Sequence, residues 1–443
     1  MNDARVVIIG GSAAGVEAAI AIQKYHKVGK VTVIRKEEKV LVPCGIPYIY
    51  GTLGAVEKNL MPDALLGSVE LVIDEATFID RKSRVVTTAN GKTVAYDKLI
   101  MATGSIPIIP RIPGVNKKNV FPIWKDAKYL EELDKALNLA KNVVVIGGGF
   151  IGVEFADECR KKGLDVTIVE MLSHCLLLAC DEEYSIMGED ILEDRGVNIL
   201  TGSAAQSIGG AEKAEYVELS DGKRLEADVV ILGIGVAPNT DLAQRVGLEL
   251  GELKGVKVDE YMRTSDPNIL AAGDCAEKTS FFTGKPSGLR LASIAVREAR
   301  LAAINLFEAR RRNEGTIGVF ATAIGDSGIG VAGLTEREAL QEGFDIVVGQ
   351  AIAVDKHPGG MPGARQLRVR LIFDRKSGRL LGGEACGGVT TGEVANMIAM
   401  AVVNRMTAGQ MVTMQIGTHP ALTASPIVYQ LVNAAEAAMV KFG

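Results

Sequence analysis

The chain of 443 residues has no apolar run long enough to cross a membrane, and it has no excess of positive charge. The strand-like segment Val6-Val7-Ile8-Ile9 comes directly after a short polar start, with no basic and apolar leader before it. With a formal net charge of −5, the chain is not expected to bind nucleic acid or an anionic membrane. A cytoplasmic location without membrane contact is expected.

Cysteine and histidine are scarce and dispersed. The six cysteines do not form a disulfide pattern, and the four histidines lie far apart, so no metal site is expected. Cys175 and Cys180 have the spacing of a redox pair, but the leucines between them favour packing. The composition, 47% hydrophobic and 23% charged, is that of an ordinary globular chain long enough for two or three domains.

Glycine is abundant, and two glycine-rich turns stand out because each follows an apolar strand and precedes a helix. The second copy is the more regular one. A strand at residues 143–146 runs into a turn whose site residues are Gly147, Gly149, Phe150, Ile151 and Gly152. Glycine lets backbone N–H groups approach a pyrophosphate, which the helix N-terminus also favours. The next strand ends in Glu170, a carboxylate suited to the adenosine ribose of NADH and repulsive to the 2′-phosphate of NADPH.

The first copy follows the strand at residues 6–9, and its site residues are Gly10, Ser12, Ala13, Ala14 and Gly15. Ser12 stands where the middle glycine is usual. The next strand ends in Arg35, where an acid is usual. Arg35 could stack on adenine or contact phosphate, and Glu37 or Glu38 could bind the ribose.

Three later segments have the form of a strand that ends in small residues or an acid. They end in Ala102-Thr103-Gly104, in Gly233-Ile234-Gly235, and in Gly273-Asp274. With the two turns, this ordered set resembles the pyridine nucleotide-disulfide oxidoreductases that bind FAD and NAD(P)H, over essentially the whole chain.

The resemblance implies an α/β fold with two Rossmann-like dinucleotide-binding domains, for FAD and NAD, plus an α+β C-terminal dimerisation domain. The implied FAD domain covers 1–112 and 251–314, the NAD domain 113–250 and the dimerisation domain 315–443. The chain is expected to form a homodimer.

The resemblance also implies roles for single residues. Ala102, Thr103, Gly104 and Gly235 would lie near the cofactors, and Asp274 would bind the ribityl chain of FAD. A helix beginning near Leu291 and Ala292 would point its N-terminus at the flavin, and Glu154 would lie near the nicotinamide.

The segment Pro43-Cys44-Gly45-Ile46-Pro47-Tyr48 is similar to that of the single-cysteine branch, in which one thiol faces the flavin. The two-cysteine branch has a second cysteine five residues later, where this chain has Ile49. The oxidase and peroxidase members carry a histidine in the first glycine turn at the position of Ala13, which counts against peroxide or oxygen as the main acceptor.

The resemblance to coenzyme A disulfide reductases is partial. Gly360 and Met361 replace a tyrosine pair, whereas Lys24 and Arg297 match basic positions that contact the substrate. His357 is a candidate substrate contact as well. His419 precedes a proline, as an acid/base residue does in two-cysteine members, but Ala424 is near the place of its usual acidic partner.

The sequence thus predicts an FAD-dependent enzyme that passes electrons from NADH through Cys44 to a low-molecular-weight persulfide, polysulfide or disulfide, including coenzyme A derivatives. NADPH is the less favoured donor. The alternatives are an NADH oxidase that reduces O₂ and an electron-transfer flavoprotein that reduces a small carrier protein.

Overall fold

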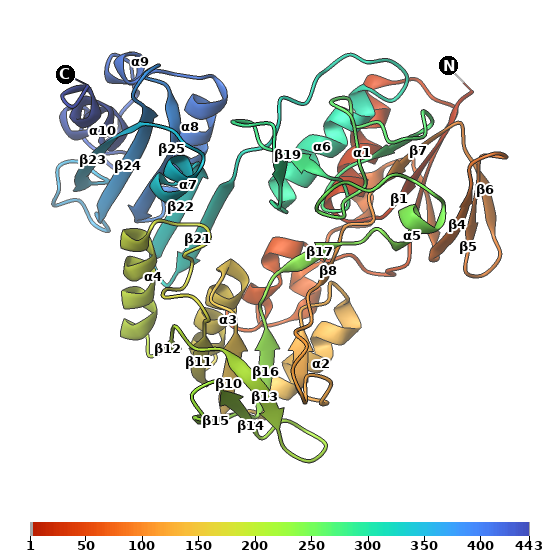
Figure 1. Ribbon diagram of the computed structural model, residues 1–443, viewed down its shortest axis with the longest axis horizontal. Coiled ribbons are helices and arrows are strands. Elements are labelled where there is room, and N and C mark those ends of the chain that lie inside the picture. Colours follow the sequence, from red (N-terminus) through yellow and green to blue (C-terminus); the bar gives the residue numbers. More distant parts are fainter. Residues whose placement is uncertain (1–2, 443) are drawn as a thin grey trace. The chain divides into compact units, whose positions relative to one another are not determined.

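The computed structural model describes residues 3–442, which fall into two compact units (Figure 1). The first unit comprises the described residues up to Ile109, with Pro122–Asn138 and Gly235–Thr316. The second comprises Pro110–Phe121, Leu139–Ile234 and the described residues from Ile317 onward. No helix within residues 3–442 combines the length and apolarity needed to cross a bilayer.

The first unit is built on a parallel sheet in the order β18-β7-β1-β2-β3. The register aligns Ile9 with both Ile34 and Met101, so the residues that follow these strands emerge at one edge. The strands are Ile269–Ala271 (β18), Lys98–Met101 (β7), Arg5–Ile9 (β1), Lys30–Arg35 (β2) and Glu70–Ile73 (β3). Most of their side chains are buried, as expected for a parallel sheet covered on both faces.

Two helices, α1 (Ala13–Tyr25) and α6 (Ala292–Ile304), pack side by side in this unit (Figure 1). Both bury many alanines, and such small side chains let the helices approach closely. The other elements of the unit are α2 (Ala127–Leu139), α5 (Asp241–Arg245), β4 (Ala76–Asp80), β5 (Val85–Thr88), β6 (Thr93–Ala95), β8 (Ser105–Pro107), β17 (Val236–Pro238), β19 (Lys278–Thr279) and β20 (Pro286–Ser287).

The second unit contains a similar sheet in the order β12-β11-β10-β16-β9, in which Ile146 pairs with Val169 and with Leu232. The helix α3 (Phe150–Lys161) follows β10 directly. The other elements of this part are β9 (Val120–Pro122), β10 (Asn142–Ile146), β11 (Asp165–Val169), β12 (Asn198–Leu200), β16 (Val229–Leu232), α4 (Glu182–Asp194), β13 (Ala205–Gly209), β14 (Tyr216–Leu219) and β15 (Arg224–Glu226).

The remainder of the second unit is an antiparallel sheet in the order β21-β22-β25-β24-β23, with α8 and α10 packed on its strands (Figure 1). The strands are Val319–Ile324 (β21), Ser327–Gly333 (β22), Ile346–Val354 (β23), Gln366–Asp374 (β24) and Leu380–Gly387 (β25), and the helices are Glu336–Gln341 (α7), Thr391–Val403 (α8), Ala408–Val412 (α9) and Gln430–Met439 (α10). The predicted fold class, with two Rossmann-like units and an α+β C-terminal part, is confirmed. The domain boundaries stay a prediction.

A buried ion pair fixes the backbone after β18. Lys278 Nζ lies 3.1 Å from Glu298 Oε2, and their side chains are only 2% and 1% exposed. The ammonium donates to the carbonyl of Gly273, and Glu298 Oε2 accepts the N–H of the same residue. Both polar groups of Gly273, which immediately precedes Asp274, are therefore held by one charged pair.

We expect Lys278→Met to lower the free energy of unfolding by about 3–5 kcal/mol, because it leaves the Glu298 carboxyl buried without a counter-charge. The double variant Lys278→Met/Glu298→Gln should recover most of that loss. Chemical denaturation measures both. The exposed pair Lys118–Glu212 is the control, and Lys118→Met should cost less than about 1 kcal/mol. Equal effects of the two lysine substitutions would contradict the expectation.

Candidate active site

The two predicted glycine turns close in the same way. Gly10 has φ +114° and Gly147 has φ +105°, a backbone conformation that side chains other than glycine rarely adopt. A Cβ on Gly15 would lie 1.9 Å from the carbonyl oxygen of Gly10, and a Cβ on Gly152 would lie 1.9 Å from that of Gly147. Each turn therefore requires glycine at both its first and its last position.

The middle position explains why Ser12 is tolerated in the first turn. Its counterpart Gly149 has no heavy atom within 4 Å of where a Cβ would lie, and its φ is −72°. Ser12 and Gly149 are the N-caps of α1 and α3, and neither helix start receives a side-chain cap. Two helix N-termini are thus left for an anion beside a close backbone turn, which fits the pyrophosphate of a dinucleotide.

Arg35 lies beneath the first turn. A Cβ on Gly11 would lie 2.4 Å from Arg35 Cδ, so the turn rests on the arginine side chain. The buried guanidinium donates to both carboxylate oxygens of Asp63, at 2.7 and 3.0 Å, and to the carbonyls of Glu37 and Glu38. Arg35 therefore ties the chain after β2 to Asp63. The interpretation that it contacts FAD remains a prediction.

Asp274 is held at the same edge of the first sheet. Ser105 donates to Asp274 Oδ2 at 2.7 Å, and Lys125 Nζ lies 3.6 Å from the same oxygen and donates to Ser105. Asp274 thus has a fixed orientation and a neighbouring cation, and a carboxylate held in this way can accept hydrogen bonds from ribityl hydroxyls. The sequence carries no local signal for Ser105 or Lys125.

Two further predicted motifs meet in the first unit. Thr103 donates from its hydroxyl to the carbonyl of Asn239, and the N–H of Asn239 donates to Gly104. The segment is continued by the pairing of β8 with β17, next to which Gly235 accepts the N–H of Ile108. Ala102 follows β7 and would clash with any side chain on Gly10.

The helix expected near residue 291 is confirmed. Leu291 is the N-cap of α6, which begins at Ala292, and no side chain caps this helix start either. Its N-terminal amides can therefore face developing negative charge, as on a reduced flavin.

Cys44 is exposed on a single helical turn, Pro43–Gly45. Asn59 holds this turn, because its side chain donates to the carbonyl of Val42 and its backbone carbonyl accepts the N–H of Val42. A Cβ on Gly45 would lie 2.0 Å from Asn59 Oδ1, so glycine is required after the cysteine. Asn59 was not predicted, since nothing in the sequence links it to a residue 15 positions away.

Glu170 contacts the second glycine turn. Its Oε2 accepts the N–H of Gly148 at 2.6 Å, and its Oε1 accepts the N–H of Leu172 at 2.8 Å. A carboxylate has further acceptor sites, so it remains able to bind ribose hydroxyls.

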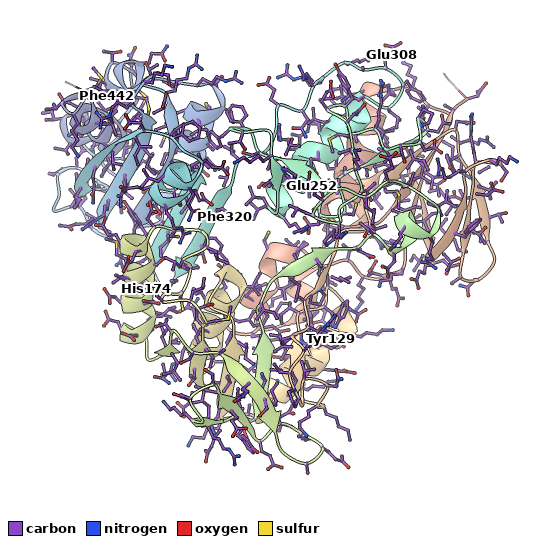
Figure 2. The ribbon with its side chains drawn as sticks, in the orientation of Figure 1. Tyr129, His174, Glu252, Glu308, Phe320 and Phe442 are labelled. Atoms are coloured by element: carbon purple, nitrogen blue, oxygen red, sulfur yellow. The ribbon has the colours of Figure 1, made fainter. Side chains whose placement is uncertain are left out.

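The segment that follows Glu170 is fixed by Glu189 on α4. One oxygen of Glu189 accepts the N–H of Cys175 at 2.6 Å, and the other lies 2.8 Å from Nδ1 of His174, which Figure 2 labels. This carboxylate raises the pKa of His174. Leu176 then donates to the carbonyl of Gly148. Burial raises the pKa of the Cys175 and Cys180 thiols, which supports packing as their role.

Glu154 lies on α3, two residues after Gly152. Burial is the main reason that its pKa is raised to about 7, and the neighbouring Glu158 adds to that effect, while a hydrogen bond from Thr322 opposes it. A carboxyl whose pKa is near neutral, two residues after the second glycine turn, is well placed to contact a cofactor or to exchange a proton.

Hydrogen bonds join the two loops that carry His357 and His419. The N–H of His357 donates to the carbonyl of Pro420, which follows His419, and His357 Nδ1 lies 2.9 Å from the carbonyl of Thr423. His419 is exposed and accepts the N–H of Ala421 at Nδ1. Met361 lies near by in the chain, in a turn closed by its hydrogen bond to Pro358.

Lys24 and Arg297, both predicted to contact the substrate, differ in exposure. Lys24 is exposed in the last turn of α1. Arg297 on α6 is partly buried and donates to Asn313 Oδ1 at 2.8 Å, and burial lowers its pKa. Their roles as substrate contacts stay predictions.

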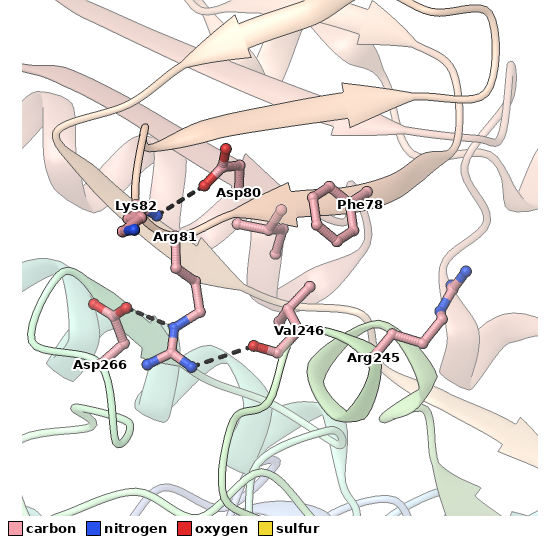
Figure 3. A pocket seen from close by; sticks show the side chains of 8 residues that line it. Phe78, Asp80, Arg81, Lys82, Arg245, Val246 and Asp266 are labelled. Atoms are coloured by element: carbon pink, nitrogen blue, oxygen red, sulfur yellow. Dashed lines mark hydrogen bonds and ion pairs between the residues drawn. The ribbon is translucent and has the colours of Figure 1, made fainter.

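A cavity of about 470 Å³ in the first unit contains none of these residues (Figure 3). It lies between the end of β4 and α5, where Arg81 binds Asp266 at 2.8 Å and the carbonyl of Val246 at 3.2 Å. Across residues 3–442, no cluster of three or more histidine, cysteine or acidic side chains is placed to bind a metal.

Several known proteins are similar to this chain over most of its length. An NADH oxidase of Methanocaldococcus jannaschii is 32% identical over 93% of this chain and 94% of its own length. An NAD(P)H coenzyme A polysulfide/persulfide reductase of Pyrococcus horikoshii is 33% identical over 86% of this chain and 87% of its own. The solved structure of an NAD-dependent persulfide reductase from A. fulgidus superposes with a TM-score of 0.92 at 30% identity, covering 99% of this chain and 83% of that one.

The family models agree with the predicted resemblance. Residues 4–299 match the pyridine nucleotide-disulphide oxidoreductase model, and residues 319–427 match the dimerisation domain of the same family. The first match alone covers well over half of the chain. The chain therefore belongs to the pyridine nucleotide-disulphide oxidoreductase family.

Proposed function

We propose that this flavoprotein transfers electrons from NADH, through FAD and Cys44, to low-molecular-weight persulfides, polysulfides or disulfides in the cytoplasm, with coenzyme A derivatives among the substrates. The observation that carries the proposal is the exposed Cys44 on a turn fixed by Asn59 and Gly45, with Ile49 in place of a second cysteine. The relatives named as persulfide and polysulfide reductases support the substrate class.

The residues that would hold FAD are the first glycine turn, the Ala102–Gly104 segment, Asp274 and the N-terminus of α6. Those that would hold NADH are the second glycine turn, Glu170 and Glu154. When bound, FAD supplies the two-electron chemistry that couples oxidation of the nicotinamide to reduction of sulfur.

The Cys44 thiolate is the nucleophile of the sulfur step. Its sulfur bonds to one substrate sulfur, the substrate S–S bond breaks, and the second sulfur leaves as a thiolate or hydrosulfide. Two electrons and protons then restore the Cys44 thiolate and release the first sulfur as a thiol, or as hydrogen sulfide where the attacked sulfur was the outer one of a persulfide. His419 and His357, on two loops that hydrogen bonds join, are candidates for protonating a leaving sulfur.

An NADH oxidase is the second candidate, because the relative from M. jannaschii bears that name. Ala13 weighs against it, since a methyl group at the first turn of α1 cannot donate a proton to reduced oxygen. A flavoprotein that reduces a carrier protein needs no exposed thiol, so Cys44 weighs against that reading.

Replacing Cys44 with serine should separate two half-reactions. We expect anaerobic reduction of the flavin by NADH, followed by stopped flow, to stay near the wild-type rate, while turnover with persulfide or disulfide is lost. A serine hydroxyl is scarcely ionised at neutral pH and displaces sulfur poorly.

Cys386→Ser is the matched control, because Cys386 is partly buried on β25 and should leave both half-reactions intact. If Cys44→Ser kept full turnover with persulfide and disulfide, Cys44 would not be the nucleophile, and an oxidase or a carrier-protein reductase would become the better proposal. Loss of turnover with O₂ as well would favour the oxidase reading.

Replacing Glu170 with alanine should reduce the preference for NADH over NADPH. The carboxylate that binds ribose and repels a 2′-phosphate is removed, so the ratio of kcat/KM for the two donors should fall about tenfold or more. Glu212→Ala, which removes an exposed carboxylate of the same unit, is the control. An unchanged ratio would show that Glu170 does not set the donor.

The dimerisation-domain match supports a homodimer. Apolar side chains are strongly exposed in this part of the chain: Val389 89%, Met400 64%, Leu422 66%, Ile427 83% and Val440 81%. Light scattering at micromolar concentration should give twice the mass of one chain, because burying such side chains stabilises a two-fold interface. A monomer would contradict this.

A further inference from the structure

One face of α3 meets one face of β21 within the second unit. The residues on the helix are Phe150, Glu154 and Asp157, which follow the i, i+4, i+7 spacing of a single helix face. On the strand, Phe320 and Thr322 are two residues apart and so point to the same side. The first two turns of α3, the helix that follows the second glycine turn, are therefore packed against β21 of the C-terminal sheet.

The central contact is a hydrogen bond in a poorly solvated position. Thr322 is buried, and its hydroxyl donates to Glu154 Oε1 at 2.9 Å. The bond favours the charged carboxylate and so opposes the rise in the Glu154 pKa that burial causes. The charged group near Glu154 on its own helix is Glu158, which is paired with Lys161 at 2.6 Å.

The outer contacts fix the alignment of the two elements. The rings of Phe150 and Phe320 are stacked, with centroids 5.2 Å apart and an interplanar angle of 21°. Figure 2 labels Phe320 on its strand. Beyond the strand, the N–H of Gly325 donates to Asp157 Oδ2, and Asp157 is itself paired with Arg195 and Lys161. Three contacts thus follow one another along α3, two of them on β21 and the third on the turn after it.

We propose that β21 is the positioning strand of the nucleotide site, with Thr322 orienting the Glu154 carboxyl and Phe320 the ring of Phe150. This assignment rests on the proposed function in one respect, namely that Glu154 and Phe150 face bound NADH. Thr322 and Phe320 act through those two residues and are positioning residues. The C-terminal sheet therefore takes part in NADH recognition through a strand that orients two residues of the nucleotide site.

Thr322→Val tests the hydrogen bond, because valine has nearly the same shape without a hydroxyl. Thr322→Ser keeps the hydroxyl. Thr391→Val is the matched control, since Thr391 is buried in the same C-terminal part and its hydroxyl bonds to the carbonyl of Gly388, away from α3. Thermal unfolding of each variant shows that the fold is intact.

Two quantities are measured from about pH 5 to about pH 9, a range that brackets the Glu154 pKa of about 7. One is the NADH concentration that gives half-maximal flavin reduction in anaerobic stopped flow. The other, which needs no turnover, is the infrared band of the protonated Glu154 carboxyl, assigned as the band that Glu154→Gln removes.

In Thr322→Val we expect the pH midpoint of the carboxyl band to rise by about one unit, because the bond that favours the charged form is gone. The half-saturating NADH concentration should rise about two- to tenfold. Thr322→Ser should match the wild type. Phe320→Leu should raise the half-saturating concentration while leaving the midpoint in place.

The proposal is overturned if Thr322→Val has the same midpoint and the same NADH dependence as Thr391→Val, or if Glu154→Gln leaves NADH dependence unchanged at every pH. Neither measurement involves a sulfur acceptor. Sulfur turnover that survives Cys44→Ser would therefore remove the proposed function while leaving this assignment standing.

Discussion

The close approach of the backbone to itself at the two glycine turns is the constraint on which the rest depends. Gly15 and Gly152 each bring a helix start so close to the carbonyl of the first glycine of the turn that there is no room for a methyl group. Any side chain there would push the helix away from the strand that precedes it. Because the neighbouring parallel strands are in register with these turns, that displacement would also move the helix N-terminus away from Arg35 in one unit and from Glu170 in the other.

Around each turn, polar contacts fix the residues that are proposed to face a cofactor. In the first unit a buried ion pair holds both polar groups of Gly273, and Ser105 and Lys125 orient the next residue, Asp274. In the second unit, the carboxylate of Glu189 fixes the segment that follows Glu170. Each of these groups lies outside the motif that it supports.

Because the supporting groups lie outside the motifs, the sequence could predict the motifs but not the groups that support them. The glycine turns and their flanking strands are local, so both dinucleotide units could be predicted from them. The resemblance that these motifs carry then implied the fold class and the start of α6, both correctly. Asn59, Lys125 and Thr322 were not predicted, because each reaches the site from a residue distant in the chain and belongs to no short motif. Arg35 shows the intermediate case: its unusual position was evident, but its partner Asp63 could be identified only from the structure.

In the proposed NADH site, Glu170 would join the sugar end of the nucleotide to its phosphate end. The carboxylate that would accept ribose hydroxyls also accepts the N–H of Gly148, an amide of the second glycine turn, which is proposed to bind the phosphates. In that site, selectivity for the sugar and geometry at the phosphates would be one coupled property. An engineer who wishes to exchange one donor for the other must supply a new acceptor for that amide as well as a new pocket for the added phosphate.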